Sequence, residues 1–161
     1  MTKKTVQENV TLKVEDVMTK EVITIDEHAT VKEAAEIMDK NEISCLIALR
    51  KLKAIGIITE RALLKRIIVE AKNLEKTKVK EVMSSSLEVV ALGTDLEKTL
   101  RLMFRKKIKK LPIVKKDNLL GLVSLIDIAR CQPAIITLLK TFAATQDTPK
   151  NIKKVVDYYV V

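Results

Sequence analysis

Residues 121–128 read GLVSLIDI, and residues 56–63 read GIITERAL. Both stretches begin with glycine, two branched apolar residues and a small hydroxyl residue, Ser124 or Thr59. Three residues after the hydroxyl, one stretch has Asp127 and the other has Ala62. Similarity at a fixed separation is the signature of an internal repeat, so the residues around these two stretches decide the fold.

Residues 13–64 align with residues 78–129 without a gap, at a constant separation of 65 positions. Each copy has a short apolar run, then apolar residues at helical spacing, then two apolar runs around a polar turn, and then a second helix start. This order predicts a β-α-β-β-α unit. Units of about 50 residues bury too little surface to be stable alone. We therefore expect an α/β (α+β) fold in which two repeats, related by a pseudo-twofold axis, pack sheet to sheet.

Capping residues locate the helix starts. Thr30 and Glu33 form a T-x-x-E capping box, and Asp95 takes the N-cap position in the second copy. The second helix of each copy begins at Thr59 or Ser124. The expected strands are residues 22–25, 45–49 and 54–58 in the first copy and 87–90, 111–114 and 119–123 in the second.

The repeat also predicts the division of the chain. We expect an N-terminal segment at residues 1–12 and a first repeat at 13–70. A polar linker at 71–77 leads to the second repeat at 78–131, and a C-terminal helical tail follows at 132–161. Within the tail, residues 135–144 are expected to extend the last helix of the second repeat. Residues 151–161 are expected to serve as a docking or dimer segment.

Composition limits the class of protein. The 161 residues are 47% hydrophobic but only 2% aromatic, with a formal charge of +9. No apolar run approaches the roughly 18 residues of a membrane span, and the first residues lack the apolar core of a signal peptide. Cys45 and Cys131 stand outside any C-x-x-C pair, which indicates free thiols in the cytoplasm. The many Lys, Glu, Ile and Val residues are compatible with a thermophilic source.

The sequence offers no catalytic constellation, so we expect no enzyme and no metal site. His28 is the only histidine and has no Cys or second His at ligand spacing, which favours a surface loop. With three glycines there is no Gly-rich phosphate loop, and no Walker, H-E-x-x-H or Ser/His/Asp set is present. We expect Cys45 to occupy a core position. The methionines that match between the copies are expected to serve packing, and they are Met18, Met38, Met83 and Met103.

The S-x-x-D sequence at Ser124 and Asp127 has two readings. It is a capping box, in which the carboxylate satisfies a backbone N–H. Alternatively, the two carboxylate oxygens accept hydrogen bonds from the vicinal hydroxyls of a ribose, while the hydroxyl and the helix start attract phosphate. Ribose and phosphate within one helical turn describe a nucleoside monophosphate. Ala62 lacks this acceptor, so the sequence predicts one competent site and one degenerate cleft.

The motif order V-M-T, V-I-T-I, helix, L-P-I-V and G-h-h-[ST]-x-x-D (h apolar) resembles the cystathionine-β-synthase (CBS) domain. Two such domains in tandem look like a Bateman module, and the resemblance covers about residues 10–131. It implies a regulatory module that binds an adenosine compound: AMP first, then ADP, ATP or S-adenosylmethionine. It also implies a homodimer and a separate, unknown regulated protein partner.

The resemblance further implies which residues hold the ligand. Asp127 and Ser124 would hold the ribose and phosphate, with basic residues Lys109 and Lys110 against the phosphates. The adenine would lie beside residues of the first repeat, namely Thr19, Val22, Ile23, Ile43 and Ser44. For the apolar members of this set, an ordinary core position is the competing interpretation.

The basic run RKKIKKLPIVKK at 105–116 supports a second functional hypothesis. The chain could be an interaction or nucleic-acid-binding scaffold with degenerate ligand clefts. Single-strand binders stack bases on aromatic side chains, and this run has only Phe104 beside it. We therefore favour the ligand sensor over the scaffold.

Overall fold

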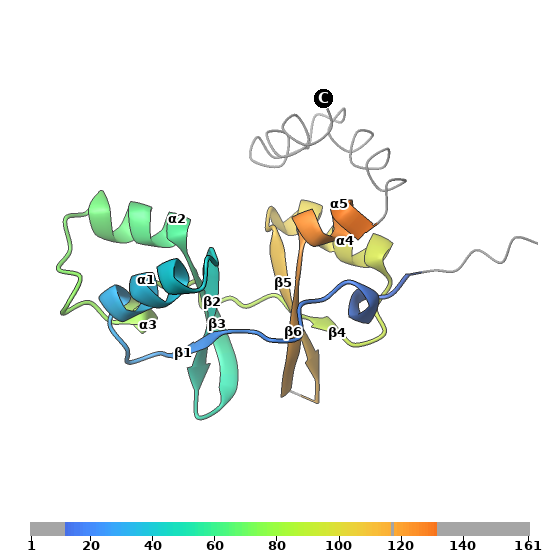
Figure 1. Ribbon diagram of the computed structural model, residues 1–161, viewed down its shortest axis with the longest axis horizontal. Coiled ribbons are helices and arrows are strands. Elements are labelled where there is room, and N and C mark those ends of the chain that lie inside the picture. The colour runs from blue at the N-terminus through green and yellow to red at the C-terminus, as the bar shows by residue number, and fades with distance from the viewer. Residues whose placement is uncertain (1–11, 117, 132–161) are drawn as a thin grey trace, which may run out of the picture. The chain divides into compact units, whose positions relative to one another are not determined.

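The computed structural model describes residues 12–116 and 118–131, and the expected C-terminal tail lies outside them. The fold is mixed α+β with two three-stranded sheets, ordered β1-β2-β3 and β4-β5-β6, as the repeat predicts. The elements in chain order, labelled in Figure 1, are η1 Val14–Asp16, β1 Thr24–Asp26, α1 Val31–Lys40, β2 Cys45–Arg50, β3 Lys53–Thr59, α2 Glu60–Leu63, the π-helix η2 Leu64–Ile68, α3 Val79–Val82, β4 Val90–Ala91, α4 Leu96–Lys106, β5 Lys110–Lys115, β6 Asn118–Ser124 and α5 Leu125–Cys131.

The described chain divides into two compact units whose limits cross those of the sequence repeats. The first unit contains residues 19–89 and 112–122. The described residues of the second are 12–18, 90–111 and 123–131. The segment that leads into the first repeat is thus part of the second unit, and the segment that leads into the second repeat is part of the first.

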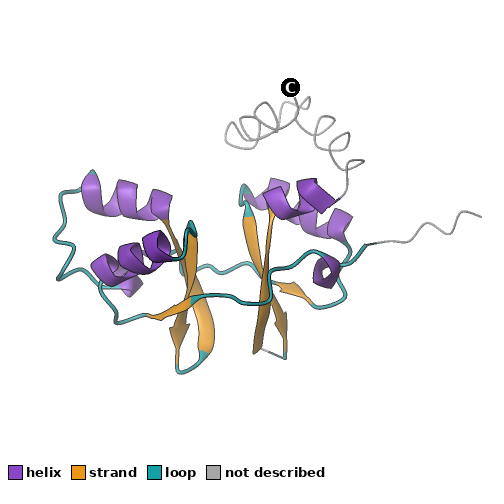
Figure 2. Cartoon of the chain, in the orientation of Figure 1, coloured by secondary structure: helices purple, strands orange, loops and turns teal. Residues whose placement is uncertain are grey.

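In the first unit, three helices cover one face of a small sheet. Strand β1 pairs with β2 in parallel and β2 pairs with β3 in the antiparallel sense, with a bulge at Ala48/Leu49. Helices α1, α2 and α3 lie on one side of this sheet (Figure 2). The buried cluster between sheet and helices consists of aliphatic residues and one methionine: Ile25, Val31, Ala34, Met38, Leu46, Ala48, Ile58, Ile67, Val79 and Val82.

The predicted capping box at the start of α1 is confirmed. The Thr30 hydroxyl accepts a hydrogen bond from the Glu33 N–H at 3.2 Å, and Glu33 Oε2 accepts the Thr30 N–H at 2.6 Å. These bonds satisfy N–H groups that a helix start leaves without partners. The Thr30 N–H, and next the Thr30 hydroxyl that donates to the same oxygen at 2.9 Å, lower the pKa of the Glu33 carboxyl because they stabilise its charged form.

Helix α3 and the residues before it form bonds with the start of α1. Thr30 and Lys78 form an antiparallel bridge, and the Val79 N–H donates to the Ala29 carbonyl at 2.9 Å. The Lys32 N–H donates to Leu74 O at 3.2 Å, and its ammonium group pairs with Glu75 at 2.9 Å. Because of these bonds, the polar segment 71–77 is packed against α1 along its length.

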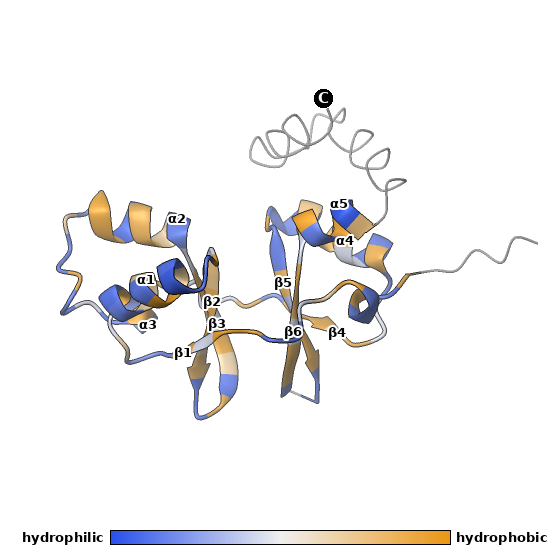
Figure 3. Cartoon of the chain, in the orientation of Figure 1, coloured by the Kyte–Doolittle hydropathy of each residue, from blue (hydrophilic) through white to orange (hydrophobic). Residues whose placement is uncertain are grey.

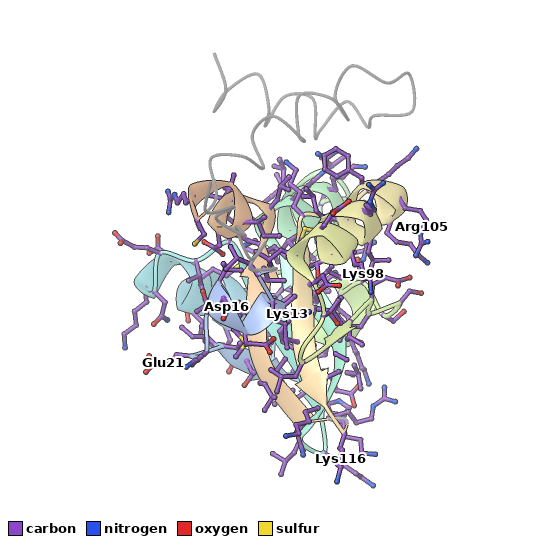
Figure 4. The ribbon with its side chains drawn as sticks, turned by 90° about the vertical axis from the view of Figure 1, so that its right-hand side faces the viewer. Lys13, Asp16, Glu21, Lys98, Arg105 and Lys116 are labelled. Carbon is purple, nitrogen blue, oxygen red and sulfur yellow. The ribbon has the colours of Figure 1, made fainter. Side chains whose placement is uncertain are left out.

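The second unit repeats this arrangement with the N-terminal segment. Lys13 forms an antiparallel bridge with Asp95, the residue that corresponds to Thr30, and Val14 N–H donates to Thr94 O at 2.9 Å. Asp95 does occupy the N-cap of α4, but its side chain makes no cap hydrogen bond. Its carboxylate instead pairs with Lys13 and with Lys98, both labelled in Figure 4, and these partners lower its pKa.

The first strand of each repeat lies later than the sequence predicts. The prediction was 22–25 and 87–90, whereas the structure has Thr24–Asp26 and Val90–Ala91. Local turns explain the difference. The N–H of Val22 donates to Lys20 O at 3.1 Å, and the N–H of Leu87 donates to Ser85 O at 3.0 Å. Donors already used in a turn are not available to a sheet.

Gly56 permits a close approach between β3 and the segment after α3. A Cβ atom at Gly56 would lie 2.7 Å from Met83 Sδ and 2.9 Å from the backbone oxygen of Ser84. Ile57, the next residue, exchanges two backbone hydrogen bonds with Ser84, at 3.1 and 2.9 Å. The missing side chain therefore lets the segment after α3 bond to β3.

We predict that Gly56→Ala lowers the free energy of unfolding by about 1–3 kcal/mol, the usual cost of overpacking. Chemical denaturation of the purified protein measures this change. Gly93→Ala is the matched control, because Gly93 has φ +85° but nothing within 4 Å of its Cβ position. It should cost only the backbone strain, about 1 kcal/mol. Equal stability of Gly56→Ala and the parent protein would contradict the steric argument.

A buried carboxylate links the end of β1 to β2. Glu27 is 3% exposed, and both of its oxygens accept hydrogen bonds from the Arg50 guanidinium, one of them at 2.7 Å. The hydrogen bonds from Arg50 lower the pKa of the Glu27 carboxyl, although burial opposes them. The charged form of Glu27 is therefore favoured in the folded protein.

This pair predicts a pH-dependent contribution to stability. Because the folded-state pKa of Glu27 is lowered, its stabilisation is present above the ordinary carboxyl pKa and is lost as the pH falls below it. Glu27→Gln should therefore destabilise the protein at pH 7 and flatten the decline of stability between about pH 5 and pH 3. Thermal unfolding across this range tests it, with exposed Glu42→Gln as control. Parallel pH profiles for Glu27→Gln and the parent would refute it.

Candidate functional site

Ser124 and Asp127 meet at the junction of β6 and α5. The Asp127 N–H donates to the Ser124 hydroxyl at 3.1 Å, so Ser124 caps the helix as the sequence predicts. The same hydroxyl donates its proton to Asp127 Oδ2 at 2.5 Å. Both side chains are partly exposed. The capping interpretation is therefore correct for the hydroxyl, and the carboxylate is held in place by it.

The carboxylate does not complete a full capping box. In the full box at Thr30 and Glu33, one carboxylate oxygen accepts both the backbone N–H and the hydroxyl. Aspartate is one methylene shorter than glutamate. Among residues 12–116 and 118–131, the hydrogen-bond partner of the Asp127 carboxylate is the Ser124 hydroxyl alone. Asp127 Oδ1 and the second lone pair of Oδ2 thus remain able to accept further donors.

Lys109 belongs to the same corner of the second unit. Its carbonyl oxygen accepts the N–H of Leu125, the first residue of α5, at 2.8 Å. Its side chain is exposed, and that of Lys110 at the start of β5 is partly exposed. The backbone of Lys109 is thus bonded to the start of the helix that carries Asp127.

The corresponding corner of the first repeat keeps the cap and lacks the acid. The Thr59 hydroxyl accepts the Ala62 N–H at 3.2 Å. The Glu60 N–H donates to Ser44 O at 3.2 Å, the counterpart of the bond between Leu125 and Lys109. The two corners share these backbone bonds and differ in side chains, with Ala62 in place of Asp127 and Ser44 in place of Lys109.

The other predicted site residues lie in the first unit. Thr19 exchanges two backbone hydrogen bonds, both 2.9 Å, with Leu122 on β6, two residues before Ser124. Ile23 and Ile43 pack against the buried cluster, as the core interpretation expects, and Val22 and Ser44 are partly exposed. The structure thus brings the side chains of Ser124 and Asp127 together, and it bonds the Lys109 carbonyl to the helix that carries Asp127. A ligand role for all of the predicted residues stays a prediction.

The expectations for His28, Cys45, Met38 and Met103 are confirmed. His28 lies in an exposed turn with 65% of its side chain accessible. Cys45 is buried in β2, and Met38 and Met103 are buried as well. Among the described residues, no group of His, Cys, Asp and Glu could hold a metal ion. In the same part of the chain, no helix is both long and apolar enough to cross a membrane.

Sequence reasoning missed an exposed apolar surface on the second helix of the first repeat. Leu64, Ile68 and Val69 are 57%, 61% and 75% exposed, although they lie in a helix whose other face is buried. The signal was present in the run ALLKRIIV (62–69), which has more apolar residues than one helix face holds.

Comparison with protein-family models shows two matches to the CBS domain, at residues 14–69 and 79–133. The chain is 33% identical over 116 residues to a CBS domain-containing protein of Bacillus subtilis, an alignment that covers 72% of this chain and 82% of that protein. It is also 34% identical over 120 residues to inosine-5'-monophosphate dehydrogenase of Methanocaldococcus jannaschii, covering 73% of this chain but only 23% of the enzyme.

Solved structures show the same fold. The hexameric CBS-CP12 protein from bloom-forming cyanobacteria superposes with a TM-score of 0.72 at 22% identity, covering 92% of this chain and 94% of that one. Tandem CBS domains typically act as regulatory ligand-binding modules. The resemblance found in the sequence is thereby confirmed at the level of family and fold.

Proposed function

The chain belongs to the CBS-domain family, with two copies of the domain in tandem, and we propose that it is a sensor of adenosine nucleotides, AMP first. The observation that carries the proposal is the carboxylate of Asp127, which is fixed by Ser124 and still has acceptor capacity. ADP, ATP and S-adenosylmethionine share the adenosine moiety and are the next candidates. We also propose that the module works in the cytoplasm.

The ribose would be bound by Asp127. The Ser124 hydroxyl holds Oδ2, which fixes the rotamer of the carboxylate before any ligand arrives. Two vicinal hydroxyls can then donate to Oδ1 and to the remaining lone pair of Oδ2. A preorganised acceptor loses little side-chain entropy on binding, and hydrogen bonds to a charged acceptor contribute about 1.5–3 kcal/mol each.

The phosphate would be bound by the basic residues near Ser124. Lys109 and Lys110 provide positive charge, and each ammonium group can donate to more than one phosphate oxygen. In the structure the Ser124 proton goes to Asp127, so the hydroxyl helps a phosphate only if it rotates away from the carboxylate. We therefore assign charge recognition to the lysines and the ribose contacts to Asp127.

The proposed action is regulatory and not enzymatic. Inosine-5'-monophosphate dehydrogenase of Methanocaldococcus jannaschii aligns with this chain over only 23% of its own length, so the aligned part is a minor portion of that enzyme. A ligand bound at Asp127 and Ser124 would favour the arrangement of the module that binds it best. The partner protein would respond to that arrangement in a homodimer of this chain.

We predict that Asp127→Ala weakens AMP binding about 10- to 150-fold, the equivalent of 1.5–3 kcal/mol. The repeat itself supplies the reason why this variant folds, because Ala62 occupies the same position behind Thr59 with its cap intact. Isothermal titration calorimetry with AMP, ATP and S-adenosylmethionine measures the loss. Unchanged affinity in Asp127→Ala would show that the ribose is not bound by this carboxylate.

The same titration decides between the sensor and the scaffold. Sub-millimolar binding by the parent chain and its loss in the variant support the sensor. If none of the three compounds gives heat, and the chain instead retains RNA at physiological salt, the scaffold hypothesis replaces it. Exposed basic residues such as Arg105 on α4, labelled in Figure 4, would then account for the retention.

The degenerate corner offers a gain-of-function prediction. Ala62→Asp places a carboxylate three residues after Thr59, in the geometry of Ser124 and Asp127. We expect the number of AMP molecules bound per chain to rise from one to two, with the second binding weakly because Ser44 replaces the lysine found at Lys109. Titration stoichiometry reports the result, and Ala62→Asn is the uncharged control. A stoichiometry that stays at one would mean that the carboxylate alone does not make a site.

A further inference from the structure

The turn between β2 and β3 holds a large apolar side chain in water on an unfavourable backbone. Arg50 pairs with Lys53 across the hairpin, so the turn itself consists of Lys51 and Leu52. Their φ angles are +47° and +64°, the pattern of a type I′ turn, in which asparagine and glycine are the usual residues. Leu52 is 90% exposed. A leucine in this conformation adds strain and gains no burial, so the fold does not explain it.

The second repeat has the same hairpin without the leucine. At the separation of 65 positions, Lys116 corresponds to Lys51 and Asp117 corresponds to Leu52. Lys116 also has a positive φ, +50°, and Figure 4 shows it at the end of the β5–β6 hairpin. Aspartate is a common turn residue, because its short side chain tolerates the left-handed conformation. A polar residue therefore suits this turn, and the leucine is specific to the first repeat.

Positive charge flanks Leu52 on both sides. Lys51 and Lys53 are exposed, and among residues 12–116 and 118–131 no carboxylate pairs with either ammonium group. Arg50 differs, because its guanidinium binds the buried Glu27 carboxylate and so anchors the start of the turn. Figure 3 shows hydrophilic residues in blue at this end of the hairpin. The turn thus presents one apolar side chain between two cations, on a fixed hairpin.

This combination fits the surface of an anionic lipid bilayer. Negative headgroups lie above apolar acyl chains, so an apolar side chain can enter the bilayer while lysines on long stems keep their charges at the headgroups. A nucleic acid would pair with the lysines but would leave Leu52 in water. A stable protein interface buries about 800 Å² per partner, more than a two-residue turn offers. A fluid bilayer, in contrast, closes around a convex turn.

We propose that the β2–β3 turn is a peripheral contact with anionic membrane surfaces, with Leu52 inserted below the headgroups and Lys51 and Lys53 at the lipid phosphates. This goes beyond the proposed function and does not depend on which ligand Asp127 binds. One leucine and two lysines make a weak, reversible contact, so we expect half-binding at about millimolar accessible lipid. Because two of the three side chains act through charge, the binding weakens as the salt concentration rises.

Cosedimentation of the full chain, without nucleotide, with phosphatidylglycerol/phosphatidylcholine vesicles tests the contact. The parent should bind these vesicles and not pure phosphatidylcholine. Leu52→Gly should weaken binding about tenfold or more, and Lys51→Gln with Lys53→Gln about 25-fold. An unbound parent, equal binding to both kinds of vesicle, or undiminished binding by these variants would overturn the proposal.

The matched charge control is Lys40→Gln with Arg61→Gln. Lys40 ends α1 shortly before β2 begins, and Arg61 follows the end of β3, so both exposed residues lie at the opposite end of the hairpin from its turn. The six residues of β2 span roughly 20 Å, which exceeds the Debye length at physiological salt. The control should therefore weaken vesicle binding about twofold or less. A loss equal to that of the turn variant would show that net charge, and not the turn, binds the lipid.

Thermal unfolding separates a binding role of Leu52 from a structural one. Glycine relieves the strain at φ +64°, so Leu52→Gly should melt about 2–4 °C above the parent while it binds vesicles less well. A side chain that serves the fold would give the opposite sign. A lower melting temperature for Leu52→Gly would therefore overturn the argument that the leucine is retained for a contact outside the chain.

A fluorescent probe tests insertion directly. The chain has no tryptophan, so Leu52→Trp places a single indole at the turn. Its emission should shift to shorter wavelength with the anionic vesicles and should be quenched by lipids brominated in the acyl chain. Unshifted emission on bound vesicles would overturn the insertion, and retention of RNA or DNA without vesicle binding would assign the turn to nucleic acid instead. Asp127→Ala should bind vesicles like the parent, so a failure of nucleotide binding and a failure of this inference are separate results.

Discussion

Two backbone bridges hold the structure together in the same way at two places. Lys13 pairs with Asp95, and Thr30 pairs with Lys78, which is the same contact displaced by one repeat. In each case a residue at the beginning of one repeat, Lys13 or Lys78, bonds to the start of the first helix in the other repeat. Each compact unit therefore contains residues from both halves of the sequence. Since neither half holds a complete unit, the repeats depend on each other for folding, as the small size of each would demand.

Much of this fold follows from the sequence, because it is written in local patterns. The repeat gives two sheets and their helices, and the capping box at Thr30 and Glu33 is present as expected. The bridges themselves join residues 82 and 48 positions apart, and no local pattern encodes them. The shortened first strands have the same cause, because turns at Val22 and Leu87 use donors that periodicity alone assigns to a sheet.

The candidate site was predictable in part. The sequence identifies Ser124 and Asp127 and leaves two readings open, and the structure confirms the cap. The hydroxyl caps the helix while its proton orients the carboxylate, which retains acceptor capacity. The exposed stripe at Leu64 and Ile68 escaped prediction, since an amphipathic pattern shows which face is apolar but not how much of it the fold covers.

The Thr59 corner shows that a cap hydroxyl suffices without an acid three residues later. Two of the four alanine codons differ from an aspartate codon by a single base, so a point substitution in a gene can exchange these two residues. The helix start accommodates both residues, so the exchange should cost the fold little. In a duplicated module the acidic position can therefore vary in one repeat at a time, while the shared backbone is inherited intact.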